Sequence, residues 1–196
     1  IQIVSAFGGR PIAVISDMSK ADYCRQLGAV GILDRSEFSH WGQLPQIDDP
    51  KGMSEWSTEV RRFGKAFWEQ LGERRNPRIV VEPSGEATIP TSIYLCDTEG
   101  MGVICGGTSG YHADVDLRFL WMRQKRLQGS HFANTQECAA ITELIARGIV
   151  DPCLSTWAPF EKVGDLHQLM YENEHPPGNM AVLVNATEPG QKDIDL

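Results

Sequence analysis

The sequence predicts an α/β fold, in which a doubly wound parallel sheet of the Rossmann type carries helices on both faces. Short apolar runs rich in β-branched residues alternate with amphipathic stretches along much of the chain. This rhythm is typical of parallel strands joined by right-handed helical crossovers. The segments that follow the apolar runs are rich in Gly and Ser, as expected where a parallel sheet presents a ligand site at its carboxyl edge.

The first residues predict the back half of a helix. Apolar residues at every third position precede a glycine pair that is a typical helix stop: Ile1, Val4, Phe7, Gly8 and Gly9. No N-cap precedes this pattern. We therefore expect the chain to be part of a longer protein, whose upstream residues supply the first strand of the sheet and its glycine-rich turn.

Apolar periodicity predicts the elements that come next. Strands are expected over 12–16 and 31–34, and the helix between them, over 19–27, ends at Gly28. The polar stretch 36–51 contains prolines and is expected to be irregular.

A long helix is predicted over 56–71, because its apolar residues recur at helical spacing on one face. A shorter helix is predicted over 87–96, with Pro90 in its first turn. Three further strands are predicted, over 78–82, 101–105 and 125–129. The runs 12–16 and 78–82 are rich in apolar β-branched residues and are expected to be buried.

The segment 111–134 is expected to be a connection that carries a ligand site. Asn134 and Glu137 then predict a capped helix that ends at Gly148. From Asp151 the pattern changes. A strand-like LSTWAPF run, a helix over 165–171 and a strand over 180–186 are expected to belong to a different layer.

The composition excludes several classes of protein. The chain has 196 residues and a net charge of −8, which argues against nucleic acid as its partner. No apolar run reaches the roughly 20 residues that span a bilayer. The five cysteines show no CxxC spacing, so we expect neither zinc nor disulfides. Cys96 and Cys105 are expected to be buried free thiols in a reducing compartment such as the cytoplasm.

Residues at three predicted strand ends form a candidate dinucleotide site. They are Ser16, Ser19, Lys20, Glu82, Pro83, Ser84, Gly85, Gly106, Gly107 and Thr108. A carboxylate at the second strand end would hold the ribose of NAD, whereas Ser16 with Lys20 nearby favours the extra phosphate of NADPH. The alternatives are that the glycines only make tight turns and that Lys20 is only a solvated helix residue.

The 111–134 connection holds the only cluster of cations and a candidate catalytic histidine. Arg118, Arg123 and Arg126, together with Lys125, are predicted to clamp phosphates of a substrate, since the guanidinium fork suits phosphate. The alternative is a solvated connection. The candidate catalytic residue His131 lies between a predicted strand and a helix N-terminus. The alternative interpretation is that His131 has a structural role only.

Several segments together resemble a known family. They are GGRPIAVIS with KADYCRQLGA, EWSTEVRRFGKAFWEQLG, IVVEPSG, GMGVICGGTSGY with DLRFLWMRQKRLQGSHFAN, and GNMAVLV. In these, the chain resembles the crotonyl-CoA carboxylase/reductase group of the medium-chain dehydrogenase/reductase superfamily, which includes the reductase part of propionyl-CoA synthases. The likeness covers nearly the whole chain, and the FLWM…KR…GSHFAN run is its most specific part.

The resemblance implies NADPH-dependent reduction of a short-chain α,β-unsaturated acyl-CoA thioester, with or without carboxylation. His131 falls at the family histidine that helps to hold carbon dioxide, and Arg118 falls near CoA. Residues 1–134 would be the dinucleotide-binding domain, and 135–196 the return segment of a GroES-like substrate domain in a homodimer or homotetramer. Pro83 and Glu86 replace a histidine and an arginine of the family. The family has a histidine two places after the Gly-Tyr pair. That position is Ala113 here, and His112 lies one place earlier. These departures put carboxylation in doubt.

Two other functions stay open on the sequence. One is a dinucleotide-binding domain without catalysis. The other is a zinc-dependent alcohol dehydrogenase of the same superfamily, whose zinc ligands would lie upstream of this chain.

Overall fold

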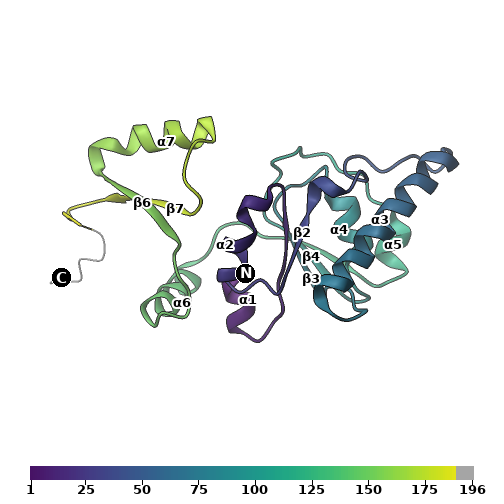
Figure 1. Ribbon diagram of the computed structural model, residues 1–196, viewed down its shortest axis with the longest axis horizontal. Coiled ribbons are helices and arrows are strands. Elements are labelled where there is room, and N and C mark those ends of the chain that lie inside the picture. The colour runs from purple at the N-terminus through teal and green to yellow at the C-terminus, as the bar shows by residue number, and fades with distance from the viewer. Residues whose placement is uncertain (189–196) are drawn as a thin grey trace. The chain divides into compact units, whose positions relative to one another are not determined.

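The computed structural model describes residues 1–188, and the chain divides into two compact units, 1–136 and 137–196 (Figure 1). The first unit contains five parallel strands in two sheets. β1 (Ile12–Ile15) pairs with β2 (Gly31–Asp34). The second sheet has the order β3-β4-β5 and contains β3 (Ile79–Glu82), β4 (Met101–Ile104) and β5 (Arg126–Gly129). These strands confirm the prediction of an α/β fold with parallel strands.

The register places the carboxyl ends of neighbouring strands side by side. Ile15 lies opposite Asp34 in the first sheet. In the second sheet Glu82 lies opposite Ile104, which in turn lies opposite Gly129. The loops that follow these strands therefore leave each sheet from one edge.

Helices connect the strands as the apolar periodicity predicts. They are α1 (Gln2–Ala6), the 3-10 turn η1 (Met18–Lys20) with α2 (Ala21–Gln26), α3 (Pro50–Leu71) and α4 (Ile89–Leu95). The prediction that α3 begins at residue 56 is wrong. The helix begins at Pro50, because proline suits the first helical turn and the Asp49 carboxylate accepts a hydrogen bond from Gly52 N at 2.9 Å.

Two short helices lie in segments expected to be irregular. The 3-10 turn η2 (Arg35–Glu37) follows β2, and the Asp34 carboxylate accepts a hydrogen bond from the Ser36 backbone N–H. Helix α5 (Leu117–Trp121) lies inside the 111–134 connection and is capped by Asp116. Both helices depend on a single aspartate cap, a signal that is short and easily missed in a sequence.

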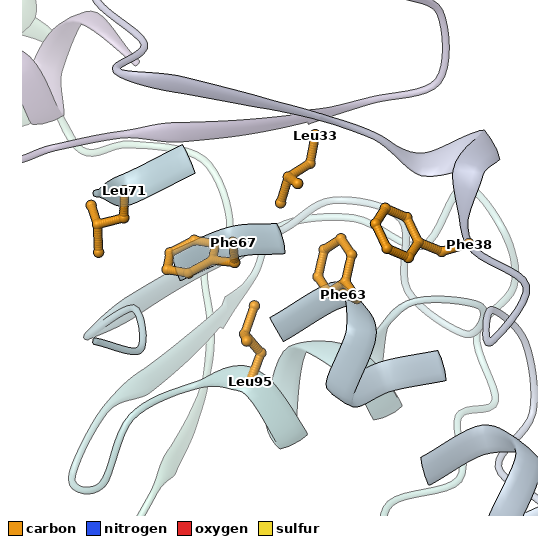
Figure 2. Close-up of a cluster of buried hydrophobic side chains, with 6 residues drawn as sticks. All are labelled: Leu33, Phe38, Phe63, Phe67, Leu71 and Leu95. Atoms are coloured by element: carbon orange, nitrogen blue, oxygen red, sulfur yellow. The ribbon is translucent and has the colours of Figure 1, made fainter. Parts of the chain in front are cut away.

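The largest core cluster of the first unit joins β2, α3 and α4 (Figure 2). Its side chains are Leu33, Phe38, Phe63, Phe67, Leu71 and Leu95. Burying each such side chain contributes about 1.5–3 kcal/mol. Since α3 packs against β1, β2 and α4, this helix ties the two sheets together.

Two predictions about burial are wrong. Strands 12–16 and 78–82 were expected to be buried, yet Val14 is 48% exposed, and Ile79 and Val81 are 64% and 63% exposed. Within residues 1–188 no strand pairs with the free edge of β1 or of β3. Cys96 is buried as predicted, but Cys105 is exposed, because it lies in the loop after β4 rather than in the strand.

The second unit has little interior of its own. It contains most of α6 (Thr135–Ala146), then β6 (Leu154–Pro159), the 3-10 turn η3 (Phe160–Lys162), α7 (Val163–Glu172) and β7 (Asn179–Leu183). β6 and β7 pair in parallel. Between residues 137 and 188 only Val150 is buried. In the described part of the chain, no helix is long and apolar enough to cross a membrane.

Candidate functional site

The loops after β3 and β4 are bonded to one another and form a continuous rim at the carboxyl edge. Ser109 donates to the Ser84 carbonyl through its backbone N–H at 2.8 Å and through its hydroxyl at 2.7 Å. The Ser109 hydroxyl also accepts from Ala87 N at 3.0 Å, and Glu86 N donates to Gly110 O at 3.2 Å. The structure therefore brings the predicted residues 83–85 and 106–108 to one place.

Glycines in this rim are required by the contact between the loops. A Cβ atom added to Gly85 would lie 2.7 Å from the carbonyl oxygen of Gly110, and Gly85 has a φ of +90°. A Cβ atom added to Gly106 would lie 2.7 Å from the carbonyl oxygen of Pro83. Close approach of one loop to the other therefore accounts for these glycines, in addition to any approach to a ligand.

The predicted binding residue Glu82 supports the rim from inside. Its side chain is buried, and one carboxylate oxygen accepts from Ser84 N at 3.0 Å, Gly85 N at 3.1 Å and the Thr88 hydroxyl at 2.6 Å. The other oxygen accepts from the Ser92 hydroxyl. Glu82 thus fixes the turn between β3 and α4.

At the carboxyl end of β1, the predicted residues Ser16, Ser19 and Lys20 are exposed. The nearby carboxylate of Asp17 accepts a hydrogen bond from Ser19 N at 2.8 Å and so caps η1. This backbone hydrogen bond is the main reason that the pKa of Asp17 is lowered. The Asp17 carboxylate therefore already has a hydrogen-bond partner at the start of η1.

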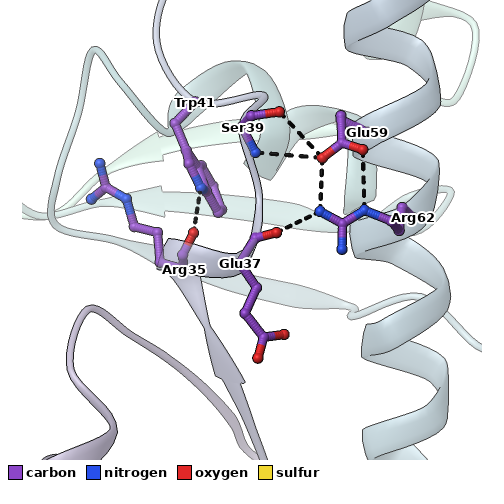
Figure 3. A network of polar contacts seen from close by, with 6 residues as sticks. All are labelled: Arg35, Glu37, Ser39, Trp41, Glu59 and Arg62. Carbon is purple, nitrogen blue, oxygen red and sulfur yellow. Dashed lines mark hydrogen bonds and ion pairs between the residues drawn. The ribbon is translucent and has the colours of Figure 1, made fainter.

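Next to this end, the loop after β2 is clamped to α3 (Figure 3). The Glu59 carboxylate accepts from the backbone N–H and the hydroxyl of Ser39, and from Arg62 at 2.8 Å. Arg62 also donates to the Glu37 carbonyl. The hydrogen bond from Arg62 is the main cause that lowers the pKa of Glu59 to about 2.

His40 lies buried inside this loop. Its ring centroid is 4.4 Å from that of Trp41 and 5.3 Å from that of Phe63. Neither ring nitrogen has a hydrogen-bond partner. Burial is the main cause that lowers the pKa of His40 to about 4, against the raising effect of Glu59. His40 is therefore a neutral packing residue at neutral pH.

The predicted catalytic residue His131 is exposed at the carboxyl edge of the second sheet. The residue before it, Ser130, donates its backbone N–H to Ile104 O at 2.8 Å. This bond carries the strand pairing one residue past β5 and places His131 beside the loop that begins at Cys105. The imidazole lies against Phe132, with 4.0 Å between the ring centroids.

The three predicted phosphate-binding arginines do not lie together. Arg118 is paired with the Asp116 carboxylate at 2.6 Å, and Arg126 donates to the Glu99 carbonyl at 3.2 Å. Arg123 lines a cavity of about 800 Å³. Arg118 and Arg126 are absent from the lining of this cavity, and phosphate binding by any of the three arginines stays a prediction.

The cavity around Arg123 is cationic and aromatic. It lies at the amino edge of the second sheet, since residues 76, 97–98 and 123–125 line it and directly precede β3, β4 and β5. Its other cations are Arg61, Lys65, Arg74 and Lys125; its aromatic side chains are Trp68, Tyr94 and Phe119. Asp97 is the one carboxylate in its lining.

Lys125 is held at the inner wall of this cavity. Its ammonium donates to Ile93 O at 2.6 Å and Tyr94 O at 3.1 Å. These are carbonyls of the last turn of α4, where a positive charge is favourable. Burial is the main cause that lowers the pKa of Lys125. Sequence reasoning missed the cavity, because its cations come from α3 and from the segments before β3 and β5.

Comparison with known families identifies one match. The family described as zinc-binding dehydrogenase matches residues 1–147. Among residues 1–188 no group of three or more His, Cys, Asp or Glu side chains is placed to hold a metal ion.

Curated relatives are similar along nearly the whole chain. A crotonyl-CoA carboxylase/reductase of Cereibacter sphaeroides is 45% identical over 190 residues, which is 97% of this chain and 44% of that protein. A crotonyl-CoA reductase of Streptomyces collinus is 38% identical over 191 residues, 96% of this chain and 40% of that protein. The chain thus spans less than half the length of these relatives.

Solved structures give the same result. The crotonyl-CoA carboxylase/reductase AntE in complex with NADP has a TM-score of 0.91 and 59% identity, and the match covers 95% of this chain and 46% of that one. The 2-octenoyl-CoA carboxylase reductase CinF, in complex with NADP and 2-octenoyl-CoA, has a TM-score of 0.81 and 33% identity. That match covers 96% of this chain and 41% of CinF.

Proposed function

Because the chain belongs to the zinc-binding dehydrogenase family, and within it to the crotonyl-CoA carboxylase/reductase group, we propose that it is the cofactor-binding part of an NADPH-dependent enoyl-CoA reductase. The substrate is a short-chain α,β-unsaturated acyl-CoA thioester. The single observation that carries this proposal is the similarity to AntE, which is described in complex with NADP, over 95% of this chain.

The carboxyl edge supplies the cofactor site in this proposal. When bound, NADPH supplies the hydride that is added to the β-carbon of the substrate. The rim formed by residues 83–87 and 105–110 offers backbone groups and hydroxyls held in fixed positions, which suits a flat ring and a pyrophosphate. We expect Lys20, which is exposed at the end of η1 after β1, to attract the 2′-phosphate of NADPH.

His131 is proposed to act on the enolate that hydride addition creates. It is exposed at the same edge as the rim and directly precedes the segment that enters α6. An imidazole donor at that edge can stabilise negative charge on the thioester oxygen, or orient a water that holds carbon dioxide. No described side chain competes for its ring nitrogens.

The cavity at the amino edge is proposed to receive phosphate groups of CoA. Arg123 and the cations of α3 give it a positive field inside a protein of net charge −8, and Trp68 and Tyr94 offer aromatic faces. The four-residue strands separate the two edges by roughly 13 Å. The long pantetheine arm of CoA allows its phosphates and its acyl group to lie at different edges.

This assignment is tested with two crotonyl thioesters, one of CoA and one of pantetheine. Arg123→Ala should raise the KM for crotonyl-CoA roughly tenfold, the effect of one charge-assisted contact. The KM for crotonyl-pantetheine, which lacks those phosphates, should stay unchanged. Arg75→Ala removes a neighbouring exposed arginine outside the cavity lining and serves as the control. Equal changes with both substrates would refute the assignment.

The reaction itself is tested by NADPH oxidation. The full-length protein is assayed with crotonyl-CoA and acryloyl-CoA, with and without bicarbonate, and the products are identified by mass. Reduction of either substrate supports the proposal. A carboxylated product identifies reductive carboxylation, and a saturated acyl-CoA alone identifies simple reduction, as the departures at Pro83 and Glu86 would favour. Cofactor binding without turnover would support the non-catalytic alternative.

The proposal includes a cytoplasmic homo-oligomer that acts together with the upstream residues of its own protein. Support for an oligomer comes from β5, which is an edge strand and whose residues are all exposed. Trp121, the last residue of α5, and the next residue Met122 are also exposed. Light scattering of the full-length protein tests this point, and a monomer at assay concentration would contradict it.

A further inference from the structure

We infer that Phe132 is a positioning residue, which orients the imidazole of His131 at the carboxyl edge. This inference rests on the proposed function, in which His131 acts on the enolate, and deepens it. It depends on the backbone conformation of Phe132, on the contact between the two rings, and on the exposure of the phenyl ring.

The backbone of Phe132 has an unusual conformation. Its φ of 53° lies in the left-handed region, which residues with a Cβ atom adopt only at a cost in energy. Gly, Asn and Asp take this conformation readily, whereas a bulky aromatic residue rarely does. Strain of this kind is concentrated at functional sites. Local preference therefore does not account for an aromatic residue at this position.

The turn at Phe132 brings its ring against that of His131. Successive side chains of an extended chain point in opposite directions, whereas these two ring centroids lie 4.0 Å apart and the ring planes are inclined by 46°. A phenyl ring has no hydrogen-bonding group, so it packs against the imidazole without occupying either ring nitrogen. Both nitrogens stay available to an enolate oxygen or to water, while the contact restricts rotation of the imidazole.

Burial does not explain the phenyl ring at this position. The side chain of Phe132 is 89% exposed, so it gains little from removal of apolar surface from water. Phe119 in the same connection differs, because its ring packs on Trp56 and Tyr94, at centroid distances of 6.2 and 5.0 Å. The contact with His131 is thus the interaction that the conformation of Phe132 provides.

The chain on the other side of His131 is also restrained. The backbone N–H of Ser130 donates to Ile104 O at 2.8 Å, so the chain leaves β5 in a fixed direction. Phe132 restrains the imidazole from the side of α6. A catalytic group that is held in this way has less freedom to lose in the transition state, which favours turnover rather than binding.

The test combines removal of the ring with a double-mutant cycle in the full-length protein. Phe132→Asn removes the ring and introduces a residue that tolerates a left-handed φ. It should slow turnover of crotonyl-CoA with NADPH roughly tenfold, while both KM values change by less than about threefold. The urea midpoint of unfolding should not fall, because the strained conformation is relieved.

The same substitution in the His131→Ala background should have no further effect on turnover, because Phe132 acts through the imidazole. Phe132→Tyr keeps an aromatic ring and should restore most of the turnover that Phe132→Asn loses. Tyr171→Asn is the matched control, since Tyr171 on α7 is 88% exposed and contacts no proposed site residue in the argument above. It should leave turnover unchanged.

Three results would overturn the inference while the proposed function stands. They are wild-type turnover in Phe132→Asn, equal slowing by this substitution with and without His131, and a lower unfolding midpoint, which would show a structural role. If His131→Ala turns over at the wild-type rate, the role of His131 fails and that of Phe132 with it. If the wild-type protein reduces neither crotonyl-CoA nor acryloyl-CoA, the proposed function itself fails.

Discussion

The two edges of the sheet formed by β3, β4 and β5 present different chemical groups. At the carboxyl edge, two glycine- and serine-containing loops bond to one another through Ser84 and Ser109. At the amino edge, cations and aromatic rings from three helices and their flanking segments line a cavity. The first edge presents fixed backbone groups and the second presents cationic side chains. This difference suggests that one edge positions a cofactor and the other attracts a phosphorylated handle.

Changing Gly85 should break the carboxyl edge and produce the largest effect on stability. A left-handed φ costs a residue with a Cβ about 1–2 kcal/mol, and the close contact with Gly110 O adds about 1–3 kcal/mol. We expect Gly85→Ala to lower the free energy of unfolding by about 2–5 kcal/mol and to weaken NADPH binding, as measured by denaturant titration and fluorescence. Gly129→Ala, where a Cβ would meet nothing within 4 Å, is the control. Equal behaviour of the two variants would contradict the interlocked rim.

Replacing His131 should affect turnover at the carboxyl edge without affecting the amino edge. Loss of one preorganised donor costs on the order of 3 kcal/mol at the step it serves. His131→Ala should therefore slow turnover roughly a hundredfold, or shift the ratio of carboxylated to protonated product, while NADPH affinity stays within a few-fold. Stopped-flow kinetics with product analysis measures this. If turnover and product ratio both stay at wild-type values, His131 has no part in the reaction.

Acid should weaken the loop that follows β2, and this effect should come from His40. The pKa of His40 is about 4 in the folded protein and close to 6.5 when unfolded. The unfolded chain therefore binds more protons between these values, and stability falls as the pH drops from about 6.5 to about 4. The loss is on the order of 3 kcal/mol.

His40→Phe should flatten the stability profile in this window, as measured by urea denaturation at several pH values. The nearby Glu59 has a lowered pKa of about 2, so its contribution is present above about pH 4.5 and is lost only at lower pH, toward 2. Arg62 stays charged throughout. An unchanged profile in His40→Phe would show that another group controls acid stability.

Much of the first unit could be predicted from the sequence, because the spacing of apolar residues indicates strands and long helices. All five strands of this unit were predicted within about two residues, and the Phe63–Phe67–Leu71 stripe of α3 is the core that was expected. The exposed Val14, Ile79 and Val81 were not anticipated, since an apolar strand does not reveal whether anything covers it.

The candidate site was predicted less completely. The strand-end loops could be found from their Gly and Ser content, and Lys20 from its place after β1. The amino-edge cavity could not, because Arg61, Arg74 and Arg123 meet only after α3, α4 and α5 have packed. The roles of the site residues and of the segment 135–196 in a substrate domain stay predictions.

The division of labour between the two edges is tested most directly by measuring two KM values in two variants of the full-length protein. The KM for NADPH and the KM for crotonyl-CoA are determined in Lys20→Ala, at the carboxyl edge of the first sheet, and in Arg123→Ala, at the amino edge of the second. We predict that Lys20→Ala raises only the KM for NADPH and that Arg123→Ala raises only the KM for crotonyl-CoA, the latter roughly tenfold. A rise in the KM for NADPH in Arg123→Ala, with the KM for crotonyl-CoA unchanged, would contradict the account.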